Sequence, residues 1–538
     1  MKVMANQTSR RAAWLIAAAS FAFCVAPSFI SYKPYQFSWD DSEYLARAIA
    51  VSHAFWSGDA HRVGAAMVSA HTPIMSLMDL AGGLLPSWDA VGNCFFTLAV
   101  VISALAAISL YMLLRIGVKP ILLVVASLCV AVALVPYATG TAASAVFYRH
   151  ALVMGFAADN PTGFMADNLL AWVALVSVLF IPYEMNTPVI TLRSAVLRGM
   201  VCASILTLGA LTKVSFFYFI VLILPLLIFA RFRSGEVRSG LAWLIAFACC
   251  CAPTAIYFLR YGESAFALGK ASSVGDVASY YYVPIWRFLA DNLRESPGLL
   301  LCAVFVTSAS LFYLIKRRLR LLDPNLLAFL IMIGFLVVLL AAPNKQSRFL
   351  FTLMVGLPFL TSLLISGEED SVVTSPAGYA GVIVFLCFVA AALPMRHRPY
   401  QPSLTRSEAV LAQASRHNMK TVVLATDSPT LNLLTLRLAS ELSGATVSIH
   451  TLAYQAMSGI SVKDDFHAID ESDMVVFQDP RSTSPSFTNQ RVSEYRAYVS
   501  RVASGSIKIA DDISAYVIHG HTESAVVATS GVIQHSKP

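Results

Sequence analysis

The chain has 538 residues, of which 57% are hydrophobic and only 13% charged, and its mean hydropathy is +0.67. Soluble globular proteins carry about 25% charged residues, so this composition excludes that class and predicts a protein that crosses a membrane several times. The formal net charge of +7 does not indicate nucleic acid as a partner, because membrane proteins concentrate Lys and Arg in their cytoplasmic loops.

Apolar runs recur from residue 12 to residue 394. A helix needs about 20 apolar residues to cross the hydrocarbon core of a bilayer, and by this measure we predict about eleven transmembrane helices. The first run follows a basic start, as in a signal peptide, but it is long for one, so we interpret it as a retained span. The predicted spans are 12–30, 92–114, 120–137, 166–183, 195–212, 214–231, 240–259, 297–315, 325–342, 348–366 and 377–394.

The basic residues predict the orientation of these spans. If the spans alternate in direction, five groups of Lys and Arg fall on one side, and that side is the cytoplasmic one. We therefore expect a multi-pass cell (inner) membrane protein with a cytoplasmic N-terminus and a C-terminal domain outside, in the periplasm. The basic groups are Arg10–Arg11, Arg115–Lys119, Arg193–Arg198, Arg231–Arg238 and the KRRLR stretch at 316–320. Three loops then face outside, at 31–91, 138–165 and 260–296.

The composition changes after Pro394, where the chain becomes polar. Short β-like runs at 421–426, 445–452, 473–479 and 515–520 alternate with a helical leucine pattern that ends at Gly444, a residue typical of a helix C-cap. We predict two parts, a transmembrane domain over residues 1–395 and a small extracytoplasmic α/β domain over residues 396–538.

The first outer loop contains an acidic pair, Asp40 and Asp41, in the stretch SWDDSEYLARA. One interpretation is a helix start, with Ser38 as the cap and the acids at the positive end of the helix dipole. The other is catalytic, since an outer carboxylate can position an acceptor hydroxyl or amine and take its proton. In a helix that starts here, Asp41 and four apolar residues would share one side: Tyr44, Leu45, Ala48 and Ile49.

Two further outer motifs accompany this pair. His71 precedes Thr72–Pro73, which is typical of a helix start, and Asp159 precedes Asn160–Pro161, which is typical of a turn before a helix. Acids from separate outer loops at one face of the membrane could nevertheless share a site, and we keep both interpretations.

Bases also occur at the predicted outer ends of spans, where the positive-inside rule does not favour them. Lys213 lies between two spans and either snorkels to the interface or binds a phosphate. Lys345 and Arg348 are better explained by an anionic ligand. Nearby aromatic residues either form an interface belt or stack on sugar rings. These aromatic residues are Tyr280, Tyr281, Tyr282 and Trp286.

The order of these motifs resembles the GT-C glycosyltransferases, polytopic enzymes that use polyprenyl-phosphate sugars. The nearer relatives are the protein O-mannosyltransferases and the lipid A aminoarabinose transferase. Their first outer loop carries an acid pair, an aromatic residue, a glycine and a His-Pro step, which correspond to WDDSEYLARA, Gly58 and HTP at 71–73. The resemblance covers residues 10–366, and Asp41 stands where glutamate is commoner.

Three later motifs extend the resemblance. Asp159 resembles the acid of a later Asp-Pro step, with Asn160 inserted before the proline. LTKVSFF at 211–217 resembles the Leu-Thr-Lys step, and KQSRFLFTLMVGLP resembles the Arg-Tyr…Pro step, with Phe349 in place of the tyrosine.

The resemblance implies an inverting GT-C type hexosyl- or pentosyltransferase. A polyprenyl-phosphate-linked sugar would be the donor, and an extracytoplasmic glycan, lipid or protein the acceptor. Asp40 is implied as the base-like acid, and Lys213 and Arg348 as the cations that hold the departing lipid phosphate. Some relatives bind a divalent metal ion at the acids, and we leave that cofactor open. The predicted catalytic set is Asp40, Asp41 and Asp159, and the predicted substrate-binding set is His71, Lys213, Lys345, Arg348, Tyr281 and Tyr282.

The alternative function is a transporter or flippase of lipid-linked sugars. Such a protein should carry polar residues near the middle of its spans, often in broken helices or repeated halves. In this sequence the charges stand at the ends of the predicted spans and no internal repeat is apparent, which favours the enzyme.

Overall fold

The computed structural model describes most of the predicted helical part and most of the polar C-terminal part. The described residues are 18, 39–67, 73–80, 90–119, 121–129, 166–186, 191–233, 237–274, 282–295, 297–316, 323–343, 350–366, 402–428, 431–453, 460–479 and 490–519. The predicted spans 12–30, apart from Ala18, and 377–394 lie outside the described residues. The chain divides into two compact units, one formed by residues 1–31, 54–148 and 160–396, the other by 32–53, 149–159 and 397–538.

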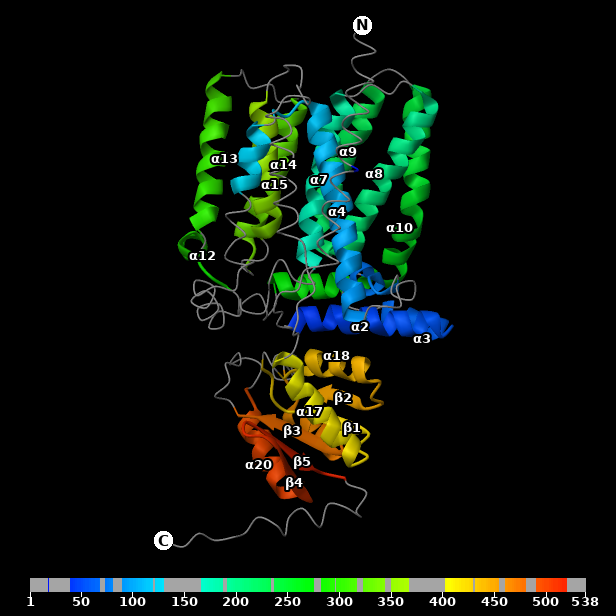
Figure 1. The fold of residues 1–538 in the computed structure, drawn as a ribbon, viewed down its shortest axis with the longest axis vertical. Helices are drawn as coiled ribbons and strands as arrows, with labels where there is room; N and C mark the ends of the chain where they lie inside the picture. Colours follow the sequence, from blue (N-terminus) through cyan, green and yellow to red (C-terminus); the bar gives the residue numbers. More distant parts are fainter. Residues whose placement is uncertain are drawn as a thin grey trace. The chain divides into compact units, whose positions relative to one another are not determined.

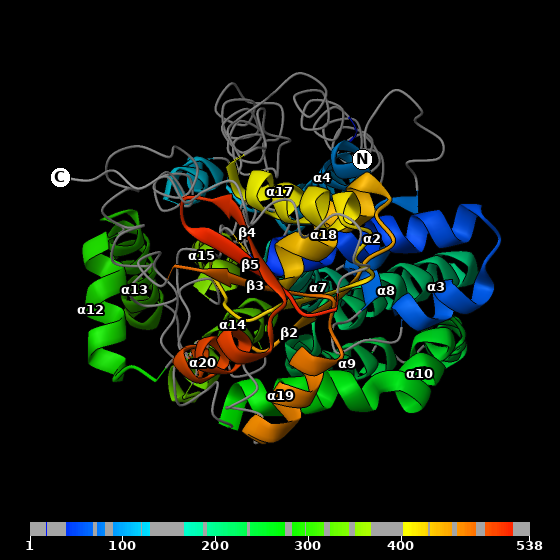
Figure 2. The ribbon, with the colours of Figure 1, turned by 90° about the horizontal axis from the view of Figure 1, so that it is seen from below.

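In the first unit, long apolar helices run side by side as a bundle, and the short helices α3 and α12 lie across them (Figures 1 and 2). Its helices are α3 (Ala60–Met67), α4 (Ala90–Ile116), α7 (Ala166–Asn186), α8 (Leu192–Thr212), α9 (Phe217–Arg233), α10 (Val237–Val274), α12 (Ile285–Glu295), α13 (Pro297–Lys316), α14 (Pro324–Ala341) and α15 (Phe351–Ile365), with short 3-10 helices η2 (Pro73–Leu77) and η4 (Val214–Phe216).

Six helices in the described part of the chain are long and apolar enough to cross a membrane. Two shorter apolar helices, Cys302–Tyr313 and Phe351–Ile365, accompany them. The predicted class, an α-helical polytopic membrane protein with a small C-terminal α/β region, is confirmed. The total of about eleven spans stays a prediction.

One predicted loop is largely helical. Helix α10 continues through residues 260–274, and α12 follows at 285–295, inside the stretch expected as an outer loop. The sequence explains the extension, because no proline occurs between Pro253 and Pro284 to end the helix.

Helix α7 forms the core of the bundle. Every residue from Ala166 to Pro182 is buried, and α7 packs against α4, α8, α9, α14 and α15. A helix that is apolar on all sides is covered either by other helices or by lipid. Helix α7 is covered by other helices, which makes it the central helix of the bundle.

Helices α8 and α10 approach each other closely because Gly199 has no side chain. A Cβ atom at this position would lie 2.4 Å from the backbone oxygen of Trp243. Further along, Thr207 Oγ1 lies 3.8 Å from Cys251 Sγ, so the two helices stay in contact as they run in the same direction. Small residues permit such contacts between membrane helices.

We expect Gly199→Ala to lower the stability of the bundle. The added methyl group meets backbone atoms that cannot rotate away, and overpacking of this kind costs about 1–3 kcal/mol. Thermal unfolding of the detergent-solubilised protein measures the effect. The control is Gly64→Ala on α3, where an added Cβ meets nothing within 4 Å. Equal unfolding temperatures for Gly199→Ala and the parent would contradict the close α8–α10 packing.

The second unit contains a five-stranded sheet with helices on both sides (Figure 2). Its strand order is β2-β1-β3-β5-β4, in which β1 is parallel to β2 and β3, and β5 is antiparallel to β3 and β4. Helices α17 and α18 cover one face, and α19 and α20 the other. The elements are α2 (Trp39–Trp56, assigned to this unit up to His53), α17 (Pro402–Arg416), β1 (Thr421–Leu424), α18 (Leu433–Ser443), β2 (Ser448–Thr451), α19 (Val462–Asp470), β3 (Met474–Gln478), α20 (Val492–Val502), β4 (Gly505–Ala510) and β5 (Ile513–Val517).

The four predicted β-runs correspond to β1, β2, β3 and β5, and Gly444 ends α18 in the left-handed conformation (φ 67°) as expected. Strand β4 was not predicted. Its sequence alternates exposed Ser506 and Lys508 with partly buried residues, a weak pattern that is typical of an edge strand.

The buried carboxylate of Asp465 connects α19 to α20 on the face of the sheet that these two helices cover. Asp465 accepts hydrogen bonds from Arg491 Nη1 at 2.8 Å and from the Tyr495 hydroxyl at 2.7 Å. Burial, followed by the hydrogen bond to Asp465, raises the pKa of Tyr495 above its ordinary value, so this hydroxyl keeps its proton. Asp465 is thus fully partnered, as a buried charge must be.

Candidate active site

The carboxylates of α7 mark the two ends of the bundle. Asp167 in the first turn pairs with Lys213, which follows α8. Glu184 in the last turn pairs with Arg231 of α9 and lies 3.6 Å from Arg198 of α8. With a rise of about 1.5 Å per residue, the two carboxylates are about 25 Å apart along α7.

This arrangement agrees with the predicted alternation of the spans. Arg198 and Arg231 belong to predicted cytoplasmic groups, and the structure brings them together at one end of α7. Lys213, predicted at the outer side, lies at the opposite end. The end that carries Lys213 is therefore the one to which the predicted outer loops attach.

The backbone around Lys213 forms a sharp break between α8 and η4. Lys213 is extended (φ −160°, ψ 137°), its N–H donates to the Gly209 carbonyl at 3.2 Å, and its carbonyl accepts from the Phe216 N–H at 2.9 Å. The Phe216 ring lies against Gly209, where a Cβ would be 2.3 Å from the ring. The glycine thus permits the turn that directs the lysine.

The side chain of Lys213 has a defined partner. Its Nζ donates to Asp167 Oδ1 at 2.5 Å, with the lysine side chain 26% exposed and the aspartate side chain only 4% exposed. A buried carboxylate requires a cation and hydrogen bonds to offset its lost hydration. Lys213 therefore has a structural role, as the counter-ion of Asp167, in addition to any role with a ligand.

Asp167 is a residue that the sequence analysis missed. It stands in the first turn of an apolar span, followed by Asn168, which is fully buried. Both the oxygen and the nitrogen of the Asn168 amide are buried without a hydrogen-bond partner among the described residues. The signal in the sequence was an acid leading directly into a span, but Asp159 was preferred because a proline follows it.

The acid pair of the first outer loop lies in the first turn of α2, which begins at Trp39. The side chains of Asp40 and Asp41 lie outside the described residues. Four of the five residues expected on one side of this helix are buried: Tyr44, Leu45, Ala48 and Ile49.

The other predicted residues divide into two groups. Tyr282 is described and is 61% exposed, just before α12. Pro73, of the predicted His-Pro step, begins the 3-10 helix η2. Five predicted site residues lie outside the described residues: His71, Asp159, Tyr281, Lys345 and Arg348.

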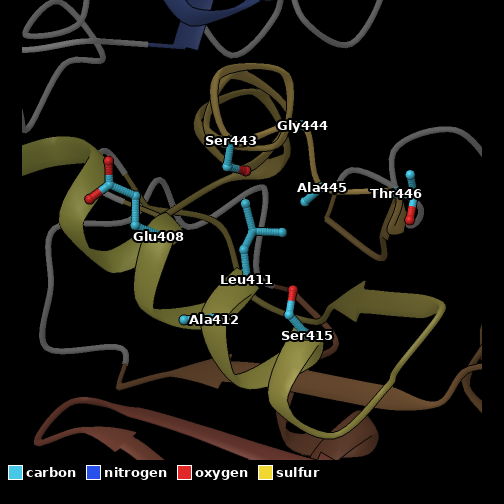
Figure 3. Close-up of a pocket in the computed structure, with 8 residues that line it drawn as sticks. All are labelled: Glu408, Leu411, Ala412, Ser415, Ser443, Gly444, Ala445 and Thr446. Atoms are coloured by element: carbon cyan, nitrogen blue, oxygen red, sulfur yellow. The ribbon is translucent and has the colours of Figure 1, made fainter.

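The described residues contain no group of three or more His, Cys, Asp or Glu side chains that could hold a metal ion. A pocket of about 460 Å³ lies in the second unit, between α17 and the turn after α18 (Figure 3). None of the predicted site residues lines this pocket. Its lining is Glu408, Leu411, Ala412, Ser415, Ser443, Gly444, Ala445 and Thr446.

No protein-family model matches the sequence, and no curated protein matches it. Among solved structures, the chain is similar to the crystal structure of ArnT from Cupriavidus metallidurans in the apo state. The two sequences are 12% identical, the alignment covers 94% of this chain and 97% of that chain, and the TM-score is 0.47.

We expect Lys213→Met to destabilise the bundle strongly and Asp167→Asn to rescue it. Removing one partner of a buried ion pair costs about 3–5 kcal/mol, because the other charge is left unpaired, whereas removing both charges costs far less. Thermal unfolding of the two single variants and the double variant measures this coupling. A double variant as unstable as Lys213→Met would show that the two side chains do not depend on each other.

Proposed function

We propose that this protein is a membrane glycosyltransferase that moves a sugar from a polyprenyl-phosphate donor to an extracytoplasmic acceptor. The observation that carries the proposal is the Lys213–Asp167 pair at one end of the apolar bundle. It provides a cation next to a buried acid, and we propose that the phosphate of a membrane-held donor binds at this end. The order of the sequence motifs supports the same function.

In the proposed reaction, an acceptor hydroxyl or amine attacks the anomeric carbon of the donor sugar. The bond from that carbon to the phosphate oxygen breaks, and the lipid phosphate leaves with the electron pair. Because the acceptor attacks from the face opposite the phosphate, the configuration at this carbon is inverted. Asp40 takes the proton of the acceptor. Lys213 and Arg348 stabilise the negative charge that develops on the phosphate.

In this proposal Lys213 contacts both Asp167 and the phosphate of the donor. An ammonium group has three donor hydrogens, and one of them is directed to Asp167 Oδ1. Asp167 orients the lysine for the phosphate.

The distribution of charge favours an enzyme over a transporter or flippase. Helix α4 has its only charged residue, Arg115, in the last turn, and α7 has its carboxylates at its two ends. Helices α14 and α15 contain no charged residue. In these described spans the charges lie at the ends, where a reaction at the membrane surface needs them, whereas transporters bind their substrates near the midplane.

The proposal requires the C-terminal domain and Lys213 to lie outside. We expect a reporter enzyme fused after residue 400 to be active only when exported, since the basic groups place the N-terminus in the cytoplasm. Paired fusions with a periplasmic and a cytoplasmic reporter measure this topology. If the fusion were active in the cytoplasm, the predicted orientation would be wrong, and Asp40 would not lie on the outer side.

The test of the function is Asp40→Asn. Asparagine has nearly the size and shape of aspartate, and the lost charge in the first turn of α2 costs only about 0.3–1 kcal/mol of helix-dipole stabilisation, so the variant should fold and insert normally. It removes the proton-accepting carboxylate, and we expect sugar transfer to fall by at least about a hundredfold. Transfer of radiolabelled sugar from the lipid-linked donor that co-purifies with the protein is the measurement.

The matched control is Asp59→Asn. Asp59 is exposed, and its carboxylate accepts the backbone N–H of Arg62 at 2.9 Å at the start of α3. Its replacement should leave transfer unchanged. If Asp40→Asn transferred sugar as fast as the parent, the acid pair would be only the start of a helix. If the parent itself transferred no sugar from a lipid-linked donor, the proposed function would be wrong.

A further inference from the structure

Helix α12 is strongly amphipathic. Successive residues of an α-helix are about 100° apart, which places Ile285, Trp286, Leu289 and Leu293 on one side. Arg287 falls on the opposite side. Helices with this pattern bind either a neighbouring protein surface or the surface of a membrane.

Only part of the apolar side of α12 is covered by the bundle. Leu289 and Leu293 are half-buried, Phe288 next to this side is 5% exposed, and α12 contacts α13. In contrast, Ile285 is 45% exposed and Trp286 72% exposed, and Tyr282, three residues before the helix, is 61% exposed. Large apolar side chains that are exposed together indicate a partner surface.

The position of α12 identifies that surface. Helix α12 ends at Glu295, and α13, a predicted span with the apolar segment Cys302–Tyr313, begins at Pro297. Figures 1 and 2 together show α12 lying across the axis of α13. If α13 crosses the membrane, α12 lies in the membrane plane, at the boundary between water and lipid.

We infer that α12 is an interfacial helix whose exposed apolar side is covered by the bilayer. Ile285 and Trp286 insert at the boundary of headgroups and acyl chains, and Tyr282 lies at headgroup level, where its ring contacts lipid and its hydroxyl remains hydrated. The inference does not depend on sugar transfer. It assigns Tyr282 to the membrane surface and not to a sugar site.

Fluorescence of Trp286 tests this placement in the full-length protein. The chain has seven tryptophans, so the signal of Trp286 is the difference between the parent and Trp286→Phe. In phosphatidylcholine nanodiscs with brominated acyl chains, we expect this difference signal to be largely quenched. Aqueous iodide should have little effect on it.

The matched control places the fluorescent tryptophan on another side of α12. In the double variant Trp286→Phe/Arg287→Trp, the indole lies about 100° away on the polar side, and we expect iodide to quench it more than brominated lipid does. Quenching of Trp286 by iodide and not by brominated lipid would overturn the inference. Protection of Trp286 from both quenchers would also overturn it, because a protein surface would then cover this side.

Discussion

The ion pair between Asp167 and Lys213 is the interaction on which the proposed site depends. Helix α7 is covered along its length, so a carboxylate in its first turn cannot be hydrated and has to meet a cation. The cation comes from the break between α8 and η4, which Gly209 permits. At the other end of α7, the buried carboxylate of Glu184 also needs cations, and Arg198 and Arg231 provide them. Together the two carboxylates fix the depth of α8 and α9 relative to α7.

Hydrophobicity predicted the helices of the bundle well because the membrane imposes a single requirement on length and composition. The bounds of α4, α8, α13 and α14 differ from the predicted spans by only a few residues. The extension of α10 was missed because its residues after 259 are polar enough to resemble a loop. In the second unit, β4 was missed because its short sequence GSIKIA alternates polar and apolar residues and has no continuous apolar run.

The candidate site was less predictable than the fold, because a site depends on which residues meet. Lys213 was identified from its unusual place between two spans, but its partner Asp167 lies 46 residues earlier. No local pattern links the two, and the nearby Asp159 had the more conspicuous sequence context. In α2, by contrast, the buried side was predicted from spacing alone, since Leu45 and Ile49 follow helical periodicity.

The order of strands in the second unit has a consequence for synthesis of the chain. Strand β3 lies between β1 and β5, and β5 also pairs with β4. Until Ile513–Val517 has left the ribosome, one edge of β3 has no strand to receive its backbone hydrogen bonds. Non-local pairing of this kind delays folding, and an open strand edge invites association with other chains. The domain can complete its sheet only after the chain has been made as far as Val517.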